Sequence, residues 1–242
     1  MNSTILTIGI FSAIVSLIGT LLGALIGVTI KKPTRKLLGS ILGIASGIMI
    51  SIIFLELIPE SIHKTNFLTT FIAILIGIVV IGFTDYLSKD KKWAKDSHRK
   101  VAFLMALGLM LHNFPEGIIM GFGFVKEANL GIKMSLLISI HDMPEGIAIA
   151  APLIASGVKG SKILWYAFLV ALPTAIGAWI GILIGAISQV FLGYCIAFAS
   201  GVMLYVVFGQ MIPESNELCS SYRNAITILI GIIFGFVMIN VI

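Results

Sequence analysis

The chain has 242 residues, of which 58% are hydrophobic and 11% are charged, and its mean hydropathy is +1.10. Soluble domains have roughly a quarter of their residues charged, so this composition excludes a soluble enzyme, a disordered chain and a nucleic-acid-binding protein, despite the net charge of +5. The two cysteines, Cys195 and Cys219, are too few for a disulfide framework or a thiolate metal cage. The composition indicates an all-α membrane protein.

Eight apolar runs follow one another along the chain, and each is long enough for a membrane-spanning helix of about 20 residues. In chain order they cover residues 5–30, 37–58, 67–87, 101–124, 132–157, 163–187, 190–212 and 224–242. Within residues 163–212, the polar pair Ser188 and Gln189 is where we expect the chain to turn. Little sequence remains for another domain, so we expect residues 1–242 to form a single transmembrane domain of eight helices.

Lysine and arginine are distributed unequally over the loops between these runs. The first, third, fifth and seventh loops contain 13 of the 16, and the other three loops contain 3. Cytoplasmic loops of membrane proteins are enriched in Lys and Arg. We therefore expect a multi-pass protein of the cell membrane (plasma or inner) with both termini external.

An internal repeat relates residues 45–61 to residues 199–215, with 9 identities in 17 positions at an offset of 154 residues. The two copies lie five crossings apart, an odd number, so they run in opposite directions across the membrane. We expect a 3+2+3 bundle, in which the first three and the last three helices are inverted repeats around a central pair. Inverted repeats are typical of transporters that bind their substrate near the membrane midplane.

The central pair of runs contains two related motifs, HNFPEG at residues 112–117 and HDMPEG at residues 141–146. Residues four apart lie on one face of a helix, so each motif presents an imidazole and a carboxylate to the same side. Carboxylates at mid-span are costly, and no Lys or Arg accompanies them, so the neutralising cation must come from outside the protein. A mixed nitrogen and oxygen donor set suits Zn²⁺, with Fe²⁺, Mn²⁺ or Cd²⁺ as alternatives. The candidate metal ligands are His112, Asn113, Glu116, His141, Asp142 and Glu145.

Four further polar residues receive structural interpretations. Glu60 and Glu214 each follow a proline near the predicted end of a helix, where charge is tolerated at the membrane interface. The alternative is that they are entry and exit groups of a pathway, because the repeat places one on each side of the membrane. His63 and His98 are interpreted as loop histidines, because histidine is ordinary at protein surfaces.

The paired motifs, the eight runs and the external termini resemble the ZIP (zinc/iron-regulated transporter-like) family, in particular its bacterial GufA-like branch. The resemblance implies transport of divalent metal, zinc first, into the cytoplasm, with the metal as substrate and not as a prosthetic group. It also implies a primary site of His112, Glu116, His141 and Glu145 and a second metal position lined by Asn113 and Asp142. Many relatives carry a glutamate on the sixth helix where this chain has Thr174, so we expect the second position to be weak or empty.

Two alternatives use the same ligands differently. An intramembrane zinc-dependent hydrolase would activate water at the metal, but the His-Glu-x-x-His motif is absent from the sequence. A metal sensor would bind the ion without transporting it. We expect no enzyme activity and no cofactor, a metal ion and the lipid bilayer as partners, and no nucleic acid; a homodimer is left open.

Overall fold

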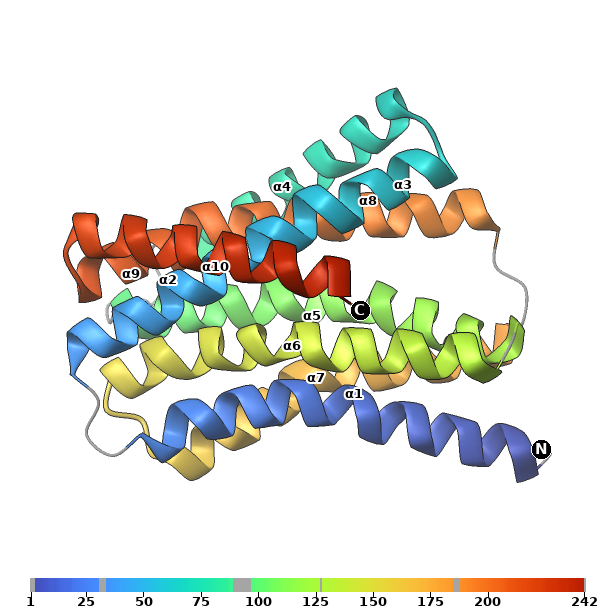
Figure 1. The fold of residues 1–242 in the computed structure, drawn as a ribbon, viewed down its shortest axis with the longest axis horizontal. Coiled ribbons are helices and arrows are strands. Elements are labelled where there is room, and N and C mark those ends of the chain that lie inside the picture. The colour runs from blue at the N-terminus through green and yellow to red at the C-terminus, as the bar shows by residue number, and fades with distance from the viewer. Residues whose placement is uncertain (1–2, 31–33, 89–96, 127, 185–187, 242) are drawn as a thin grey trace.

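The computed structural model describes residues 3–30, 34–88, 97–126, 128–184 and 188–241, and these form helices joined by short turns. Figure 1 shows most of the helices running side by side along the longest axis of the molecule. In chain order they are α1 (Ser3–Thr29), α2 (Arg35–Ile52), η1 (Ile53–Leu57), α3 (Ile58–Lys64), α4 (Phe67–Ser88), α5 (Ser97–Lys126), α6 (Ala128–Ala155), α7 (Gly160–Ile184), α8 (Gln189–Val206), η3 (Val207–Met211), α9 (Ile212–Leu218) and α10 (Ser221–Val241).

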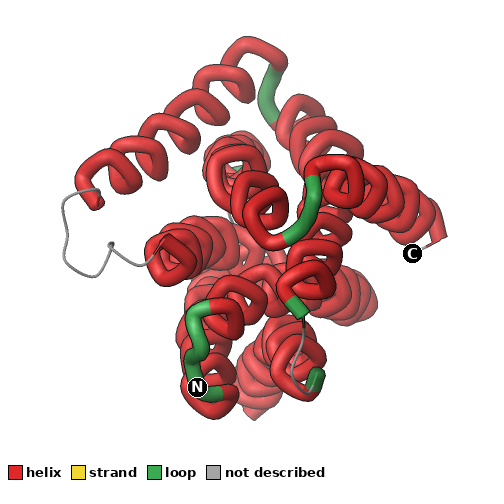
Figure 2. The backbone as a smooth tube through the Cα atoms, turned by 90° about the vertical axis from the view of Figure 1, so that its left-hand side faces the viewer, coloured by secondary structure: helices red, strands yellow, loops and turns green. Residues whose placement is uncertain are grey.

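Six helical stretches in the described part of the chain are long and apolar enough to cross a membrane. They are Arg35–Lys64, Phe67–Leu87, His98–Val125, Gly160–Leu183, Gln189–Leu218 and Ser221–Asn240. The end-on view in Figure 2 shows helix packed against helix throughout. Large apolar side chains remain exposed on α4 and α10, among them Phe71, Val79 and Ile233. The molecule is therefore an all-α membrane protein whose outer helices present an apolar surface.

Two of these stretches are compound helices that continue past a proline. A π-helical turn, η1 or η3, joins α2 to α3 and α8 to α9. In these turns the Ile58 N–H donates to the Ile53 carbonyl and the Ile212 N–H donates to the Val207 carbonyl, five residues back. The proline that follows each turn lies in the first turn of the next helix, where its missing N–H is not needed. Both helices therefore extend six residues beyond the ends predicted at residues 58 and 212.

Hydrogen bonds around the compound helices occur in pairs at positions 154 residues apart. The Ser61 hydroxyl donates to the Gly193 carbonyl at 2.9 Å, and the Ser215 hydroxyl donates to the Gly39 carbonyl at 2.6 Å. Adding 154 to Ser61 gives Ser215, and adding 154 to Gly39 gives Gly193. Each bond ties the short helix at the end of one compound helix to the beginning of the other.

Close backbone contacts follow the same spacing. A Cβ atom on Gly47 would lie 2.1 Å from the Ile228 carbonyl oxygen, and one on Gly201 would lie 2.1 Å from the Ile74 carbonyl oxygen. No side chain fits at such distances, so glycine lets α2 pack directly on α10 and α8 on α4.

The helices that contain the two motifs are packed in the same way. A Cβ on Gly117 would lie 2.0 Å from the Thr174 carbonyl oxygen, and one on Gly146 would lie 2.0 Å from the Thr20 carbonyl oxygen. Thr20 and Thr174 are again 154 residues apart. The last residue of each motif thus locks α5 against α7 and α6 against α1.

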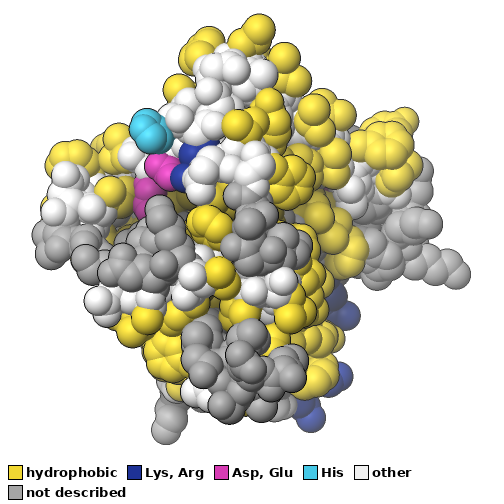
Figure 3. Space-filling view, turned by 90° about the vertical axis from the view of Figure 1, so that its right-hand side faces the viewer, with side chains coloured by type: hydrophobic (Ala, Val, Ile, Leu, Met, Phe, Trp, Pro, Cys, Tyr) yellow, Lys and Arg dark blue, Asp and Glu magenta, His cyan; other side chains and the backbone are white. Residues whose placement is uncertain are grey.

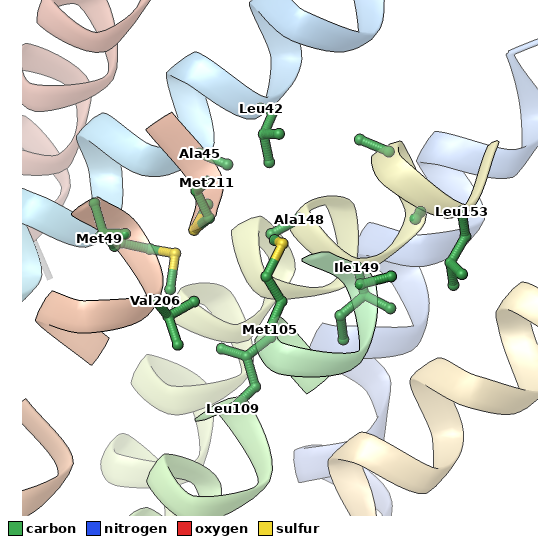
Figure 4. Close-up of a cluster of buried hydrophobic side chains, with 14 of the residues drawn as sticks. Leu42, Ala45, Met49, Met105, Leu109, Ala148, Ile149, Leu153, Val206 and Met211 are labelled. Carbon is green, nitrogen blue, oxygen red and sulfur yellow. The ribbon is translucent and has the colours of Figure 1, made fainter. Parts of the chain in front are cut away.

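An apolar core lies next to the motifs. Figure 4 shows its buried side chains converging from α2, α5, α6, α8 and η3, including Leu42, Met49, Met105, Leu109, Ala148, Val206 and Met211. Leu109 precedes His112 by one turn, and Ala148 follows Glu145 by one turn. The core therefore fixes the rotation of α5 and α6 that turns the polar motif residues inward.

Candidate metal centre

The described side chains of the predicted ligands lie in the middle of α5 and α6 and are almost completely buried. The exposed fraction is 0% for His112, Asn113, Asp142 and Glu145, and 4% for Glu116. Both helices continue through their internal prolines. So many ionisable groups inside an apolar bundle are costly unless they bind a partner of opposite charge.

One imidazole joins the two motifs. His112 Nε2 lies 3.0 Å from Glu116 Oε1, one turn further along α5, and 3.6 Å from Glu145 Oε1 on α6. Ligand atoms around a tetrahedral zinc ion lie about 3.4 Å apart, since zinc bonds to nitrogen and oxygen are about 2.1 Å long. Both distances from His112 Nε2 are close to this spacing, so the imidazole can share one ion with either carboxylate.

A hydrogen bond orients the Asn113 amide. Its Nδ2 atom donates to the carbonyl of Val170 on α7 at 3.1 Å. Its Oδ1 atom is buried and has no hydrogen-bond partner among the described residues. Thr174, one turn beyond Val170, is 0% exposed and its hydroxyl also has no hydrogen-bond partner in the described part of the chain. The Asn113 Oδ1 atom is thus a buried acceptor that a cation could use.

The remaining two predicted ligands are placed less completely. Asp142 is fully buried on α6, one turn before Glu145. The backbone of His141 lies in α6, but its side chain is outside the described residues. The structure thus brings together His112, Glu116 and Glu145 of the predicted primary quartet.

A second group of side chains of metal-ligand types lies at one end of the bundle, and no pattern in the sequence relates all three of its members. One donor atom each from His98, Glu214 and Glu217 lies within 4.8 Å of the others. His98 is in the first turn of α5 and not in a loop, because α5 begins four residues before its predicted start at residue 101. Glu214 is only 2% exposed, unlike an ordinary helix-end glutamate. The three-residue spacing of Glu214 and Glu217 indicates that they lie on one face of a helix. Their contact with His98 on α5 depends on how the helices pack, which the sequence spacing does not predict.

Comparison with known proteins gives similarity over much of the chain. A family model described as ZIP zinc transporter matches residues 88–242. The zinc transporter GufA of Myxococcus xanthus is 39% identical over 138 residues, which cover 57% of this chain and 53% of that protein. The zinc transporter ZupT of Shigella flexneri is 35% identical over 160 residues, covering 64% of this chain and 62% of the relative. The chain thus matches less than two thirds of the length of these curated relatives.

Proposed function

This chain belongs to the ZIP zinc transporter family, and from that membership we propose that it carries divalent transition-metal cations, zinc first among them, across a membrane. The ion is the transported substrate. The observation that carries the proposal is the buried His112 imidazole between the carboxylates of Glu116 and Glu145. Fe²⁺, Mn²⁺ and Cd²⁺ suit the same nitrogen and oxygen donors.

The charges of this site favour a divalent ion that binds reversibly. Glu116 and Glu145 contribute two negative charges when ionised, which one divalent cation neutralises. Glu145 comes from α6, whereas His112 and Glu116 come from α5. A small relative shift of these two helices would separate the donors and release the ion, which is what a carrier requires and a structural metal site avoids.

We further propose eight crossings in the 3+2+3 arrangement, with both termini external and residues 1–242 as one transmembrane domain of the cell membrane. The six apolar stretches support this count together with α1 and α6, which are 27 and 28 residues long. Helices of that length reach about 40 Å and exceed the roughly 30 Å hydrocarbon core. The contacts at 154-residue spacing support inverted repeats, and the central position of both motifs in their helices fits a midplane substrate site.

The proposal is tested by uptake of ⁶⁵Zn²⁺ into proteoliposomes containing the full chain. Glu116→Ala and Glu145→Ala should each abolish saturable uptake, because either change removes a charged ligand that lies beside His112. Glu60→Ala is the control, since Glu60 is half exposed and pairs with Lys64. Saturable uptake at the normal rate by both Glu116→Ala and Glu145→Ala would refute the assigned site.

The same preparation separates transport from its two alternatives. An intramembrane hydrolase would cleave a peptide substrate in a zinc-dependent manner, and a sensor would bind zinc without moving it. We expect vesicle-enclosed ⁶⁵Zn²⁺ and no peptide cleavage, in keeping with a family of transporters.

A further inference from the structure

The cluster of His98, Glu214 and Glu217 offers the same donors as the proposed transport site, one imidazole and two carboxylates. His98 Nδ1 lies 2.5 Å from Glu214 Oε1, and His98 Nε2 lies 3.9 Å from Glu217 Oε1. One imidazole and two carboxylates are also what His112, Glu116 and Glu145 provide. Two sites with equal donor chemistry prefer the same metals.

The internal repeat shows how the equivalent glutamate is neutralised at the other end of the bundle. Residues 60, 63 and 64 correspond to residues 214, 217 and 218 at the offset of 154. At the first end, Lys64 neutralises Glu60 at 2.8 Å and also donates to Gln189 at 2.7 Å. Figure 3 views the end of the molecule that carries α3, where acidic, basic and histidine side chains lie side by side.

At the opposite end of the bundle, where His98, Glu214 and Glu217 lie, no lysine stands at the position equivalent to Lys64. Leu218 stands where the repeat has Lys64, and Glu217 stands where it has His63. In the described part of the chain, no Lys or Arg pairs with Glu214, whose side chain is 1% exposed. Arg35 reaches Glu217 only at 3.8 Å, with both side chains more than half exposed, so that contact is weak.

Another opening at the same end is unsuited to a cation. A cavity of about 610 Å³ lies between α5 and α7, and Arg99, Lys159 and Lys162 line it. Three positive charges at its wall disfavour a divalent ion. The acidic cluster beside it therefore offers the more favourable electrostatic environment.

We propose that His98, Glu214 and Glu217 form a second binding site for a divalent transition metal, zinc or a similar ion. Donors around a tetrahedral zinc ion lie about 3.4 Å apart, whereas the donor atoms of this cluster lie within 4.8 Å of one another, so binding one ion requires shifts of up to about 1.4 Å (4.8 − 3.4). Glu217 is half exposed and supplies this movement. A metal that binds His98 Nδ1 displaces the proton shared with Glu214, which is released to the solvent, and water fills the remaining coordination positions.

The role that we propose for this site follows from the solvent exposure of Glu217. An ion bound there exchanges with the solution, whereas an ion at His112 is sealed inside the bundle. The site thus serves as the place where metal enters or leaves the transport path at this end. That role rests on the proposed function, but metal binding by the three residues does not.

Equilibrium dialysis with ⁶⁵Zn²⁺ on the purified full chain tests the site. The background is the double variant Glu116→Gln/Glu145→Gln, in which the buried site is disabled. We expect this background to retain one bound zinc ion, and His98→Asn or Glu217→Gln added to it should weaken that binding at least tenfold. Glu214 is left intact because it is buried and its replacement endangers folding.

Matched controls come from the other end of the repeat. His63→Asn and Glu60→Gln, added to the same background, should leave zinc binding unchanged. Zinc binding that is unaffected by both His98→Asn and Glu217→Gln overturns the second site, as does an equal loss in the two controls. Failure of the proposed function has a different signature, namely saturable ⁶⁵Zn²⁺ uptake that persists in the Glu116→Gln/Glu145→Gln background.

Discussion

We propose that Thr174 limits the number of metal ions bound at the buried site. It lies on α7 one turn from Val170, whose carbonyl holds the Asn113 amide. Two divalent ions a few ångströms apart repel each other strongly in a low-dielectric interior. A hydroxyl cannot offset that repulsion as a carboxylate would, so Glu116 and Glu145 would have to balance both ions almost alone.

We therefore predict that the unmodified protein holds one tightly bound ion at the buried site and that Thr174→Glu allows a second there. Elemental analysis of purified protein should show the metal content rising by about one ion per chain. The measurement uses a His98→Asn background, which removes the proposed site at His98, Glu214 and Glu217. Thr174→Gln has the same shape without the charge and should leave the content unchanged. Two tightly bound ions at the buried site before any substitution would contradict the argument.

Residue spacing predicted part of this site and could not predict the rest. The four-residue spacing placed His112 and Glu116 on one face of α5, which the 3.0 Å contact bears out. The contact of His112 with Glu145 depends on how α5 and α6 pack, and no local pattern encodes it. The cluster at His98 was missed for the same reason, since its members lie 116 residues apart in sequence.

At the scale of elements, glycine contacts set the distance between the helices that carry the donors. Gly117 and Gly146 each end a motif, and each faces a backbone carbonyl 2.0 Å from where a Cβ would stand. A backbone carbonyl in a helix cannot move aside as a flexible side chain can. Any side chain at these positions must therefore push α5 from α7 or α6 from α1.

Gly117→Ala and Gly146→Ala should each destabilise the folded protein by about 1–3 kcal/mol or more, the usual cost of overpacking. Gly82→Ala is the control, because the nearest atom to its Cβ would be in the Tyr205 side chain at 3.1 Å. Thermal melting of the solubilised protein, followed by size-exclusion chromatography, measures the difference. Equal melting temperatures for Gly146→Ala and Gly82→Ala would show that the α1 contact is not rigid.

Helix ends were the least predictable elements. The prolines at residues 59 and 213 indicate helix ends in the sequence, because proline lacks a backbone donor and the residues that follow are polar. A π-helical turn before each proline accommodates the missing backbone donor, and the compound helices continue to residues 64 and 218. A π-turn depends on a single shifted hydrogen bond, for which the sequence of residues 53–57 gives no signal.

At the scale of the whole molecule, orientation decides what each end of the bundle does. The cluster of His98, Glu214 and Glu217 lies at the end where α2 begins and α9 finishes, as Figure 1 shows. The 13 to 3 distribution of Lys and Arg predicts that this end is cytoplasmic. With inward transport, metal would then reach the His98 cluster after leaving the His112 site.

Cysteine labelling tests this orientation. In a background with Cys195→Ala and Cys219→Ala, cysteine is introduced at Asn66, between α3 and α4, or at Ser220, between α9 and α10; both positions are exposed. A membrane-impermeant maleimide should label Asn66→Cys in intact cells and Ser220→Cys only after permeabilisation. Retained ⁶⁵Zn²⁺ uptake shows that each variant is folded. The reverse labelling pattern would place the His98 cluster outside, where it would capture metal before transport instead of releasing it.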